Sequence, residues 1–78
     1  MNSNNNAARQ RGIVRRIIDS GAAFVAPESG GADIYAHPVA IRRSGVAHIE
    51  TGDRVSFDLA PSRSIPGRFE AQNIKVEN

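Results

Sequence analysis

Two side chains that can bind flat ligands stand two residues apart within the segment 30–41. The segment reads Gly-Gly-Ala-Asp-Ile-Tyr-Ala-His-Pro-Val-Ala-Ile, so Tyr35 supplies an aromatic ring and His37 an imidazole. Residues two apart in a β-strand project from the same face. With Ile34 and Ala36 turned toward a core, the two rings lie side by side on the surface. Such a surface suits stacking by a nucleobase, because every base has a π-face.

Catalytic and metal-binding chemistry is poorly represented in the chain. There is no cysteine, there are two histidines ten residues or more apart, and no motif pairs two carboxylates. Asp33 and His37 share a strand face but are separated by about 13 Å, at about 3.3 Å per residue, which is too far for a hydrogen bond. No Gly-x-x-x-x-Gly-Lys phosphate loop is present. We therefore expect no enzyme, no metal site and no cofactor, and only local hydrogen bonds for His48.

Arginine provides nearly all of the positive charge. Nine of the ten basic residues are arginines, and the net charge is +2. Arg9, Arg11, Arg15 and Arg16 face only one acid, Asp19, in the first twenty residues. This local excess attracts a polyanion, because guanidinium groups bind phosphate and also stack on bases. A solvated strand edge is the alternative. For the other arginines, a place in a groove and simple solvation stay equally open: Arg42, Arg43, Arg54, Arg63 and Arg68.

The length of 78 residues allows one small domain. An Asn-rich start without apolar periodicity predicts a disordered tail over residues 1–10 and a folded domain over 11–78. No apolar run approaches the roughly 20 residues of a membrane span, and no secretory signal is apparent. Together with the absence of cysteine, this favours a cytoplasmic protein with no membrane partner.

Five short strands and one helical turn account for the hydrophobic pattern. β-Branched runs, alternation and turn residues predict strands over 13–18, 22–26, 33–37, 54–59 and 69–76, with a helical turn over 38–43 and a loop over 61–67. An open sheet of this size leaves two edges unpaired. We therefore predict an all-β fold, a five-stranded antiparallel Greek-key barrel of the oligonucleotide/oligosaccharide-binding (OB) type.

The core predicted from these alternations is light, because the chain has no tryptophan. It comprises Val14, Ile17, Val25, Ile34, Ile41, Ile49, Val55, Phe57 and Ile74. The register of the second strand stays open at this point. A shift by one residue places Phe24 inside and Val25 outside, since a slip moves every side chain to the other face.

The segment 30–41 resembles the second ribonucleoprotein motif of the cold-shock domain family. In that family, a strand reading roughly Asp-Val-Phe-Val-His follows a Gly-rich turn and runs into Ser-Ala-Ile; here it reads Asp-Ile-Tyr-Ala-His. Four further segments follow the family's order with nearly its spacing, at residues 12–15, 21–25, 52–57 and 71–74. The resemblance spans about Arg11 to Val76. It implies a barrel that holds single-stranded RNA or DNA over its first three strands.

The resemblance also implies which residues bind. Phe24, Tyr35 and His37 match the family's stacking positions, and Arg15 matches a basic position on the first strand. Arg16 stands where the family has an exposed tryptophan, and a guanidinium plane can also stack on a base. Other departures are the loss of family phenylalanines at Ala22, Pro38 and Val46, a turn one residue shorter before Ser20, and a longer loop over 61–67. We therefore expect weak binding of low sequence specificity by a monomer that acts as a nucleic-acid chaperone or regulator.

Two other functions of the same barrel stay open. Residues 49–55 and the pair Gly67-Arg68 also resemble the small bacterial translation initiation factor of this barrel class, which works on the ribosome. Alternatively, the face that has lost aromatics is a protein-interaction surface with Ala22, Pro38 and Val46 at its apolar centre. The Tyr-x-His pattern favours the nucleic-acid interpretation over the initiation factor, which has no reason to carry it.

Overall fold

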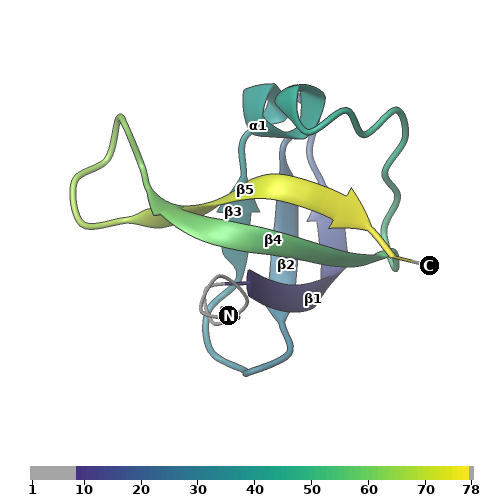
Figure 1. Cartoon of the computed structure of the whole chain (residues 1–78), viewed down its shortest axis with the longest axis horizontal. Helices are drawn as coiled ribbons and strands as arrows, with labels where there is room; N and C mark the ends of the chain where they lie inside the picture. The colour runs from purple at the N-terminus through teal and green to yellow at the C-terminus, as the bar shows by residue number, and fades with distance from the viewer. Residues whose placement is uncertain (1–8, 78) are drawn as a thin grey trace, which may run out of the picture.

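Five strands close on themselves in the computed structural model, which describes residues 9–77 (Figure 1). The elements are β1 (Arg9–Ile17), β2 (Ala23–Pro27), β3 (Ile34–Ala36), α1 (Pro38–Arg43), β4 (Arg54–Pro61) and β5 (Phe69–Val76). Around the barrel the order is β1-β2-β3-β5-β4, and β4 pairs with β1 to close it. Neighbouring strands are antiparallel except β3 and β5, which pair in parallel. The predicted OB-type barrel and the helical turn over 38–43 are confirmed.

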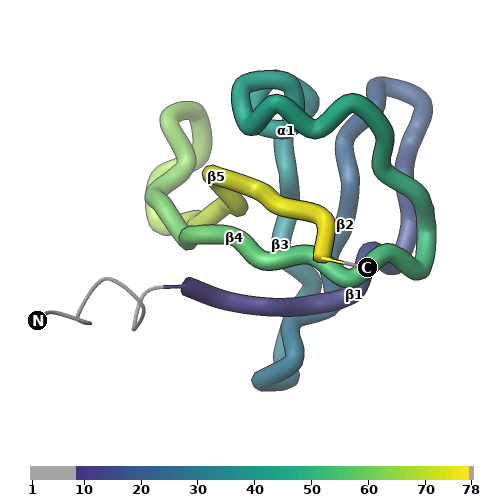
Figure 2. The backbone as a smooth tube through the Cα atoms, turned by 45° about the vertical axis from the view of Figure 1, so that its right-hand side comes forward, coloured from purple at the N-terminus to yellow at the C-terminus, as the bar shows by residue number. Residues whose placement is uncertain are grey.

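The first strand, β1, pairs with two neighbours, β4 and β2. Its early residues pair with β4 and its later residues with β2, and Arg15 is the extra residue where the β2 register shifts between Val14 and Arg16. Such a bulge bends a strand, and Figure 2 shows β1 curving from one side of the barrel toward β2. Gly12 lies in this curve, where an added Cβ would come within 2.4 Å of the Ala26 carbonyl oxygen. The barrel therefore requires glycine at this close approach.

The barrel core consists of one large ring among small side chains. Phe57 is fully buried, and Val14, Val25, Val55 and Ile74 are buried around it. Three residues of the predicted core are only partly buried at its edge: Ile17, Ile34 and Ile49. Ile41 of the predicted core is buried as well, and alanines fill much of the remaining interior at Ala22, Ala23, Ala36, Ala40 and Ala71. The predicted core contains no alanine, because the prediction considered only large apolar residues that alternate along a strand. The narrow interior of a small barrel also needs small side chains between the large ones.

The folded domain begins earlier than residue 11. Arg9 and Gln10 are already in β1, where they pair with Asp58 and Phe57 of β4. The predicted tail otherwise falls on residues 1–8, which lie outside the described residues, so it stays a prediction. Within 9–77 no helix is long and apolar enough to cross a membrane.

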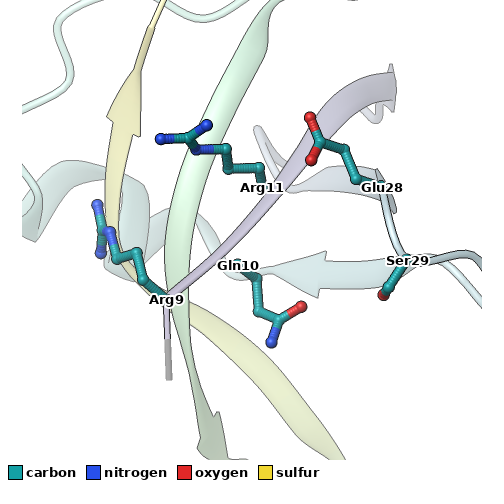
Figure 3. Close-up of a pocket in the computed structure, with 5 residues that line it drawn as sticks. All are labelled: Arg9, Gln10, Arg11, Glu28 and Ser29. Atoms are coloured by element: carbon teal, nitrogen blue, oxygen red, sulfur yellow. The ribbon is translucent and has the colours of Figure 1, made fainter. Parts of the chain in front are cut away.

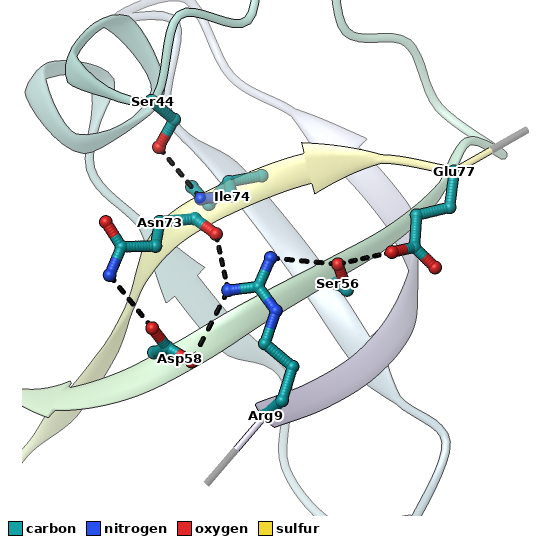
Figure 4. Close-up of polar contacts among 7 residues, drawn as sticks. All are labelled: Arg9, Ser44, Ser56, Asp58, Asn73, Ile74 and Glu77. Atoms are coloured by element: carbon teal, nitrogen blue, oxygen red, sulfur yellow. Dashed lines mark hydrogen bonds and ion pairs between the residues drawn. The ribbon is translucent and has the colours of Figure 1, made fainter. Parts of the chain in front are cut away.

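A polar network around Arg9 joins β1, β4 and β5 (Figure 4). The Arg9 guanidinium donates to the Asn73 carbonyl oxygen at 2.7 Å and to Ser56 Oγ at 3.0 Å, and it lies 3.3 Å from the Asp58 carboxylate. The Asn73 side-chain amide donates to Asp58 at 2.8 Å, and Ser56 Oγ donates to Glu77 at 2.7 Å. The hydrogen bond from Asn73, together with Arg9, holds the pKa of Asp58 below its ordinary value, against an opposing effect of burial.

This network explains one departure from the predicted alternation in β4. Ser56 is buried although it lies between the core residues Val55 and Phe57, and its hydroxyl contacts Arg9 and Glu77. A buried hydroxyl is stable only with hydrogen-bond partners. Arg9 and Glu77 supply them.

Candidate nucleic-acid interface

One row of side chains crosses four strands of the barrel. The strand register places Arg16 of β1 opposite Phe24 of β2, Phe24 opposite Tyr35 of β3, and Tyr35 opposite Glu70 of β5. Side chains at paired positions share a face and lie next to one another. We call Arg16, Phe24, Tyr35 and Glu70 the cross-strand row.

The aromatic members of the row face outward. Val25 and Ala36, the residues after Phe24 and Tyr35, are buried in the core. The two rings are therefore on the outer side of β2 and β3, and both are half-buried. The alternative register, with Phe24 inside and Val25 outside, is excluded.

The rings contact one another in a fixed arrangement. Phe24 and Tyr35 are 5.4 Å apart between ring centroids, edge to face, and Tyr35 and His37 are 6.1 Å apart, also edge to face. Both distances lie in the range preferred by aromatic pairs. The Arg16 Cζ atom lies 4.7 Å from the Phe24 ring centroid, within the range of a cation–π contact. The sequence-predicted Arg16, Phe24, Tyr35 and His37 thus form one continuous surface.

Arg68 and Glu70 belong to this surface as well. The Arg68 Cζ atom lies 4.6 Å from the Tyr35 ring centroid, and its Nε lies 3.5 Å from a carboxylate oxygen of Glu70. Sequence reasoning left Arg68 open between groove and solvent and did not single out Glu70. The available signal was their spacing of two residues at the start of the last strand, because Arg68 directly precedes β5 and Glu70 lies within it. Their place beside Tyr35 depends on the parallel β3–β5 pairing, which local pattern does not specify.

Two predicted residues carry an additional structural role. Arg15 is exposed beside Arg16, but its Nε lies 3.1 Å from both carboxylate oxygens of Asp33. His37 is exposed and caps α1, because its Nδ1 accepts the Val39 N–H at 3.0 Å. In a neutral ring this leaves the proton on Nε2, which can donate outward. The charge of Arg15 is therefore partly neutralised by Asp33. The orientation of the His37 ring is fixed by its hydrogen bond with the Val39 N–H.

A hollow of about 400 Å³ lies along the row. Its lining residues are Phe24, Tyr35, His37, Ser64, Ile65, Arg68 and Glu70. Ser64, Ile65 and Arg68 come from the β4–β5 loop, which projects from the barrel at one side in Figure 1. The groove therefore has a floor of rings and one wall made by a loop.

Comparison with known proteins assigns this arrangement to a family. A family model described as the 'Cold-shock' DNA-binding domain matches residues 10–76. The chain belongs to the cold-shock domain family. It is 31% identical over 56 residues to a probable cold shock protein of Sinorhizobium fredii, covering 72% of this chain and 80% of that protein. It is 41% identical over 52 residues to a cold shock-like protein of Bordetella pertussis, covering 65% and 78% respectively.

The predicted family and its general function are thereby confirmed. This cold-shock domain protein is a nucleic-acid-binding protein of the cold-shock type, a class without enzymatic activity. The resemblance to the initiation factor is not favoured by these matches.

A larger hollow of about 700 Å³ in this cold-shock domain lacks the chemistry for bases. It is lined by Arg9, Gln10, Arg11, Glu28 and Ser29, and Figure 3 shows the two arginines on β1 with Glu28 beyond them. Arg9 is taken up by the polar network, and Arg11 lies 3.8 Å from Glu77. None of these five lining residues carries an aromatic ring for stacking, and the Glu28 carboxylate repels a polyanion. Size alone does not make this hollow the interface.

The apolar centre suggested for a protein-interaction surface is incomplete on this cold-shock domain. Ala22 is fully buried, because the Ile18 N–H donates to its carbonyl and the Ser20 hydroxyl accepts from its N–H, folding the turn over it. Pro38 and Val46 are half-buried. His48 makes a local contact, its Nε2 lying 2.8 Å from Glu50. Among the described residues, no group of three or more histidine or acidic side chains is arranged to hold a metal ion.

Proposed function

We propose that this protein binds single-stranded RNA or DNA along the cross-strand row. The observation that supports this most directly is the contact chain from Arg16 through Phe24 and Tyr35 to His37. Each base stacked on an aromatic ring is worth roughly 1–3 kcal/mol. Arg15 stands beside the row and can exchange Asp33 for a phosphate. Together these residues provide both stacking and positive charge along the bound nucleic-acid strand. They are Arg15, Arg16, Phe24, Tyr35 and His37.

We propose further that binding is weak and of low sequence preference. Guanidinium groups already lie over the rings of Phe24 and Tyr35, so a base must stack on a guanidinium or displace it. An exposed cation–π contact of about 0.5–1 kcal/mol offsets part of each stack. Stacking and phosphate contacts do not read base edges, so little sequence information enters.

The mechanism that follows is mass action without catalysis. A protein that binds unpaired strands but not duplexes shifts hairpins toward their open form. All groups of the row come from one chain, so a monomer in the cytoplasm suffices for this role. Sedimentation of the protein with and without a short oligonucleotide tests the monomer.

Titration with a short single-stranded oligonucleotide, followed by amide NMR shifts, tests the location of the site. We expect shifts to cluster at residues 12–18, 21–25, 34–38 and 64–70, and a duplex of the same sequence to produce much smaller shifts. Tyr35→Ala should weaken binding by roughly 1–3 kcal/mol without changing its salt dependence, because it removes a stack and no charge. Shifts confined to the hollow at Arg9, Arg11 and Glu28 would contradict the proposal.

A further inference from the structure

The hollow along the cross-strand row continues into another hollow between α1 and the β4–β5 loop, which we call the second hollow. It measures about 270 Å³ and shares His37, Ser64 and Glu70 with the hollow along the cross-strand row. Arg43 of α1 and Arg63 of the loop also line it. In Figure 2 both α1 and the β4–β5 loop lie in the upper part of the view, and residues of both segments line this hollow. The shared residues make the two hollows one groove that turns past His37.

The two arginines in this second hollow differ in pairing from most others. Within residues 9–77, ion pairs with carboxylates hold Arg9, Arg11, Arg15 and Arg68. In that same range no carboxylate is at ion-pair distance from Arg43 or Arg63, and both are exposed. The acid that lines the hollow, Glu70, is paired with Arg68 and its side chain is only 11% exposed. The hollow therefore presents net positive charge.

Hydrogen bonds hold both walls of the second hollow in place. Ser44, next to Arg43, donates its Oγ to the Ala40 carbonyl at 2.7 Å and accepts the Ile74 N–H at 2.8 Å, which ties α1 to β5 (Figure 4). Ser62, next to Arg63, accepts N–H groups of two loop residues at 3.2 and 3.1 Å and donates its own N–H to the Arg68 carbonyl at 2.7 Å. Arg43 and Arg63 are therefore attached to backbone segments that hydrogen bonds hold in place.

We propose that a strand bound on the cross-strand row continues into this second hollow, where Arg43 and Arg63 hold its phosphates. The inference rests on the proposed function and extends its site. Among the residues that line the second hollow, His37, at the junction, is the only aromatic group. The second hollow therefore binds backbone and not bases. Its contribution depends on the length of the strand and on salt, but not on sequence.

Affinity for two oligonucleotide lengths tests this extension. A strand of about four nucleotides occupies the row alone, and one of about ten nucleotides reaches both hollows, within the site sizes known for barrels of this type. Arg43→Ala and Arg63→Ala should each weaken binding of the longer strand about three- to tenfold and make the slope of log K against log salt shallower by about 0.7. Binding of the shorter strand should change less than about twofold.

Arg42→Ala is the matched control, because it removes the same charge from the neighbouring exposed position of α1, outside the lining of either hollow. It should leave binding of both lengths nearly unchanged, and circular dichroism should show all three variants folded. Equal losses for both lengths, or losses as large for Arg42→Ala, would overturn the proposed path and indicate a general effect of charge. No loss in either variant would overturn it as well. Failure of the proposed function is distinct: the unsubstituted protein would then bind neither length.

Discussion

Arginine is used in two different ways in two regions of this barrel. At the seam of β1, β4 and β5, Arg9 is mostly buried, with 24% of its side chain exposed, and it contacts Asn73, Ser56 and Asp58. On the cross-strand row, Arg16 is exposed and lies over a phenylalanine ring, and within residues 9–77 no carboxylate is at ion-pair distance from it. The arginine at the seam thus holds three strands together, whereas the arginine on the cross-strand row stays available to a ligand.

This difference separates stability from binding. A partly buried guanidinium that contacts three partners cannot be removed without leaving those partners short of a donor. Breaking hydrogen bonds to charged groups costs about 1.5–3 kcal/mol each. An exposed guanidinium over a half-buried ring loses only a weak cation–π contact when a ligand binds it instead. Substitutions at the seam should therefore change unfolding, and substitutions on the row should change binding.

The largest effect is expected from Arg9→Met. It should lower the free energy of unfolding by about 2–3 kcal/mol, because Asp58, Ser56 and the Asn73 carbonyl lose a shared donor. Denaturant unfolding measures the change. Arg11→Met is the control on the same strand: its side chain is 67% exposed, so we expect a change of at most about 0.5 kcal/mol. Equal stability of the two variants would show that the seam does not depend on Arg9.

A smaller effect, on binding alone, is expected at Arg16. Arg16→Ala should weaken binding of a single strand by about 1 kcal/mol and make its salt slope shallower by about 0.7, while the unfolding midpoint stays unchanged. Arg16→Trp should instead tighten binding by about 1–2 kcal/mol with the same shallower slope, because a stack replaces a charge. Calorimetric titration at three salt concentrations separates the contribution of stacking to the affinity from that of charge, because only the charge changes the salt slope. Unchanged affinity in both variants would remove Arg16 from the interface.

The smallest effect concerns the acid stability of the seam. The folded-state pKa of Asp58 is lowered from its ordinary value of 3.8, so its contribution to stability is present above that value and is lost as the pH falls through the folded pKa. Thermal midpoints should therefore drop more steeply below about pH 4 in the unsubstituted protein than in Asp58→Asn. The difference is modest because the Asp58 side chain is 35% exposed. Parallel curves for the two proteins would contradict this role of Asp58.

Much of the fold follows from local pattern. Turn residues and alternation locate the strands and the helical turn over 38–43, since the side-chain period is a property of each strand alone. They also place Phe24 and Tyr35 outward once Val25 and Ala36 are recognised as inward residues. The alanine core and the buried Ser56 do not follow from local pattern. The alanine core depends on how closely the strands approach across the barrel, and the burial of Ser56 depends on contacts with Arg9 and Glu77.

The sequence by itself determined which chemistry was available: stacking rings at Phe24, Tyr35 and His37, and arginines without a matching number of local acids. Only the tertiary structure decided which arginines remain available. Arg9 and Arg15 are bound by Asp58 and Asp33, partners that lie 49 and 18 residues away along the chain. It also brought Arg68 and Glu70 to Tyr35 through a parallel pairing of β3 with β5. The reason is that local periodicity sets the face of a side chain, whereas its neighbour across the strands is set by register and barrel closure.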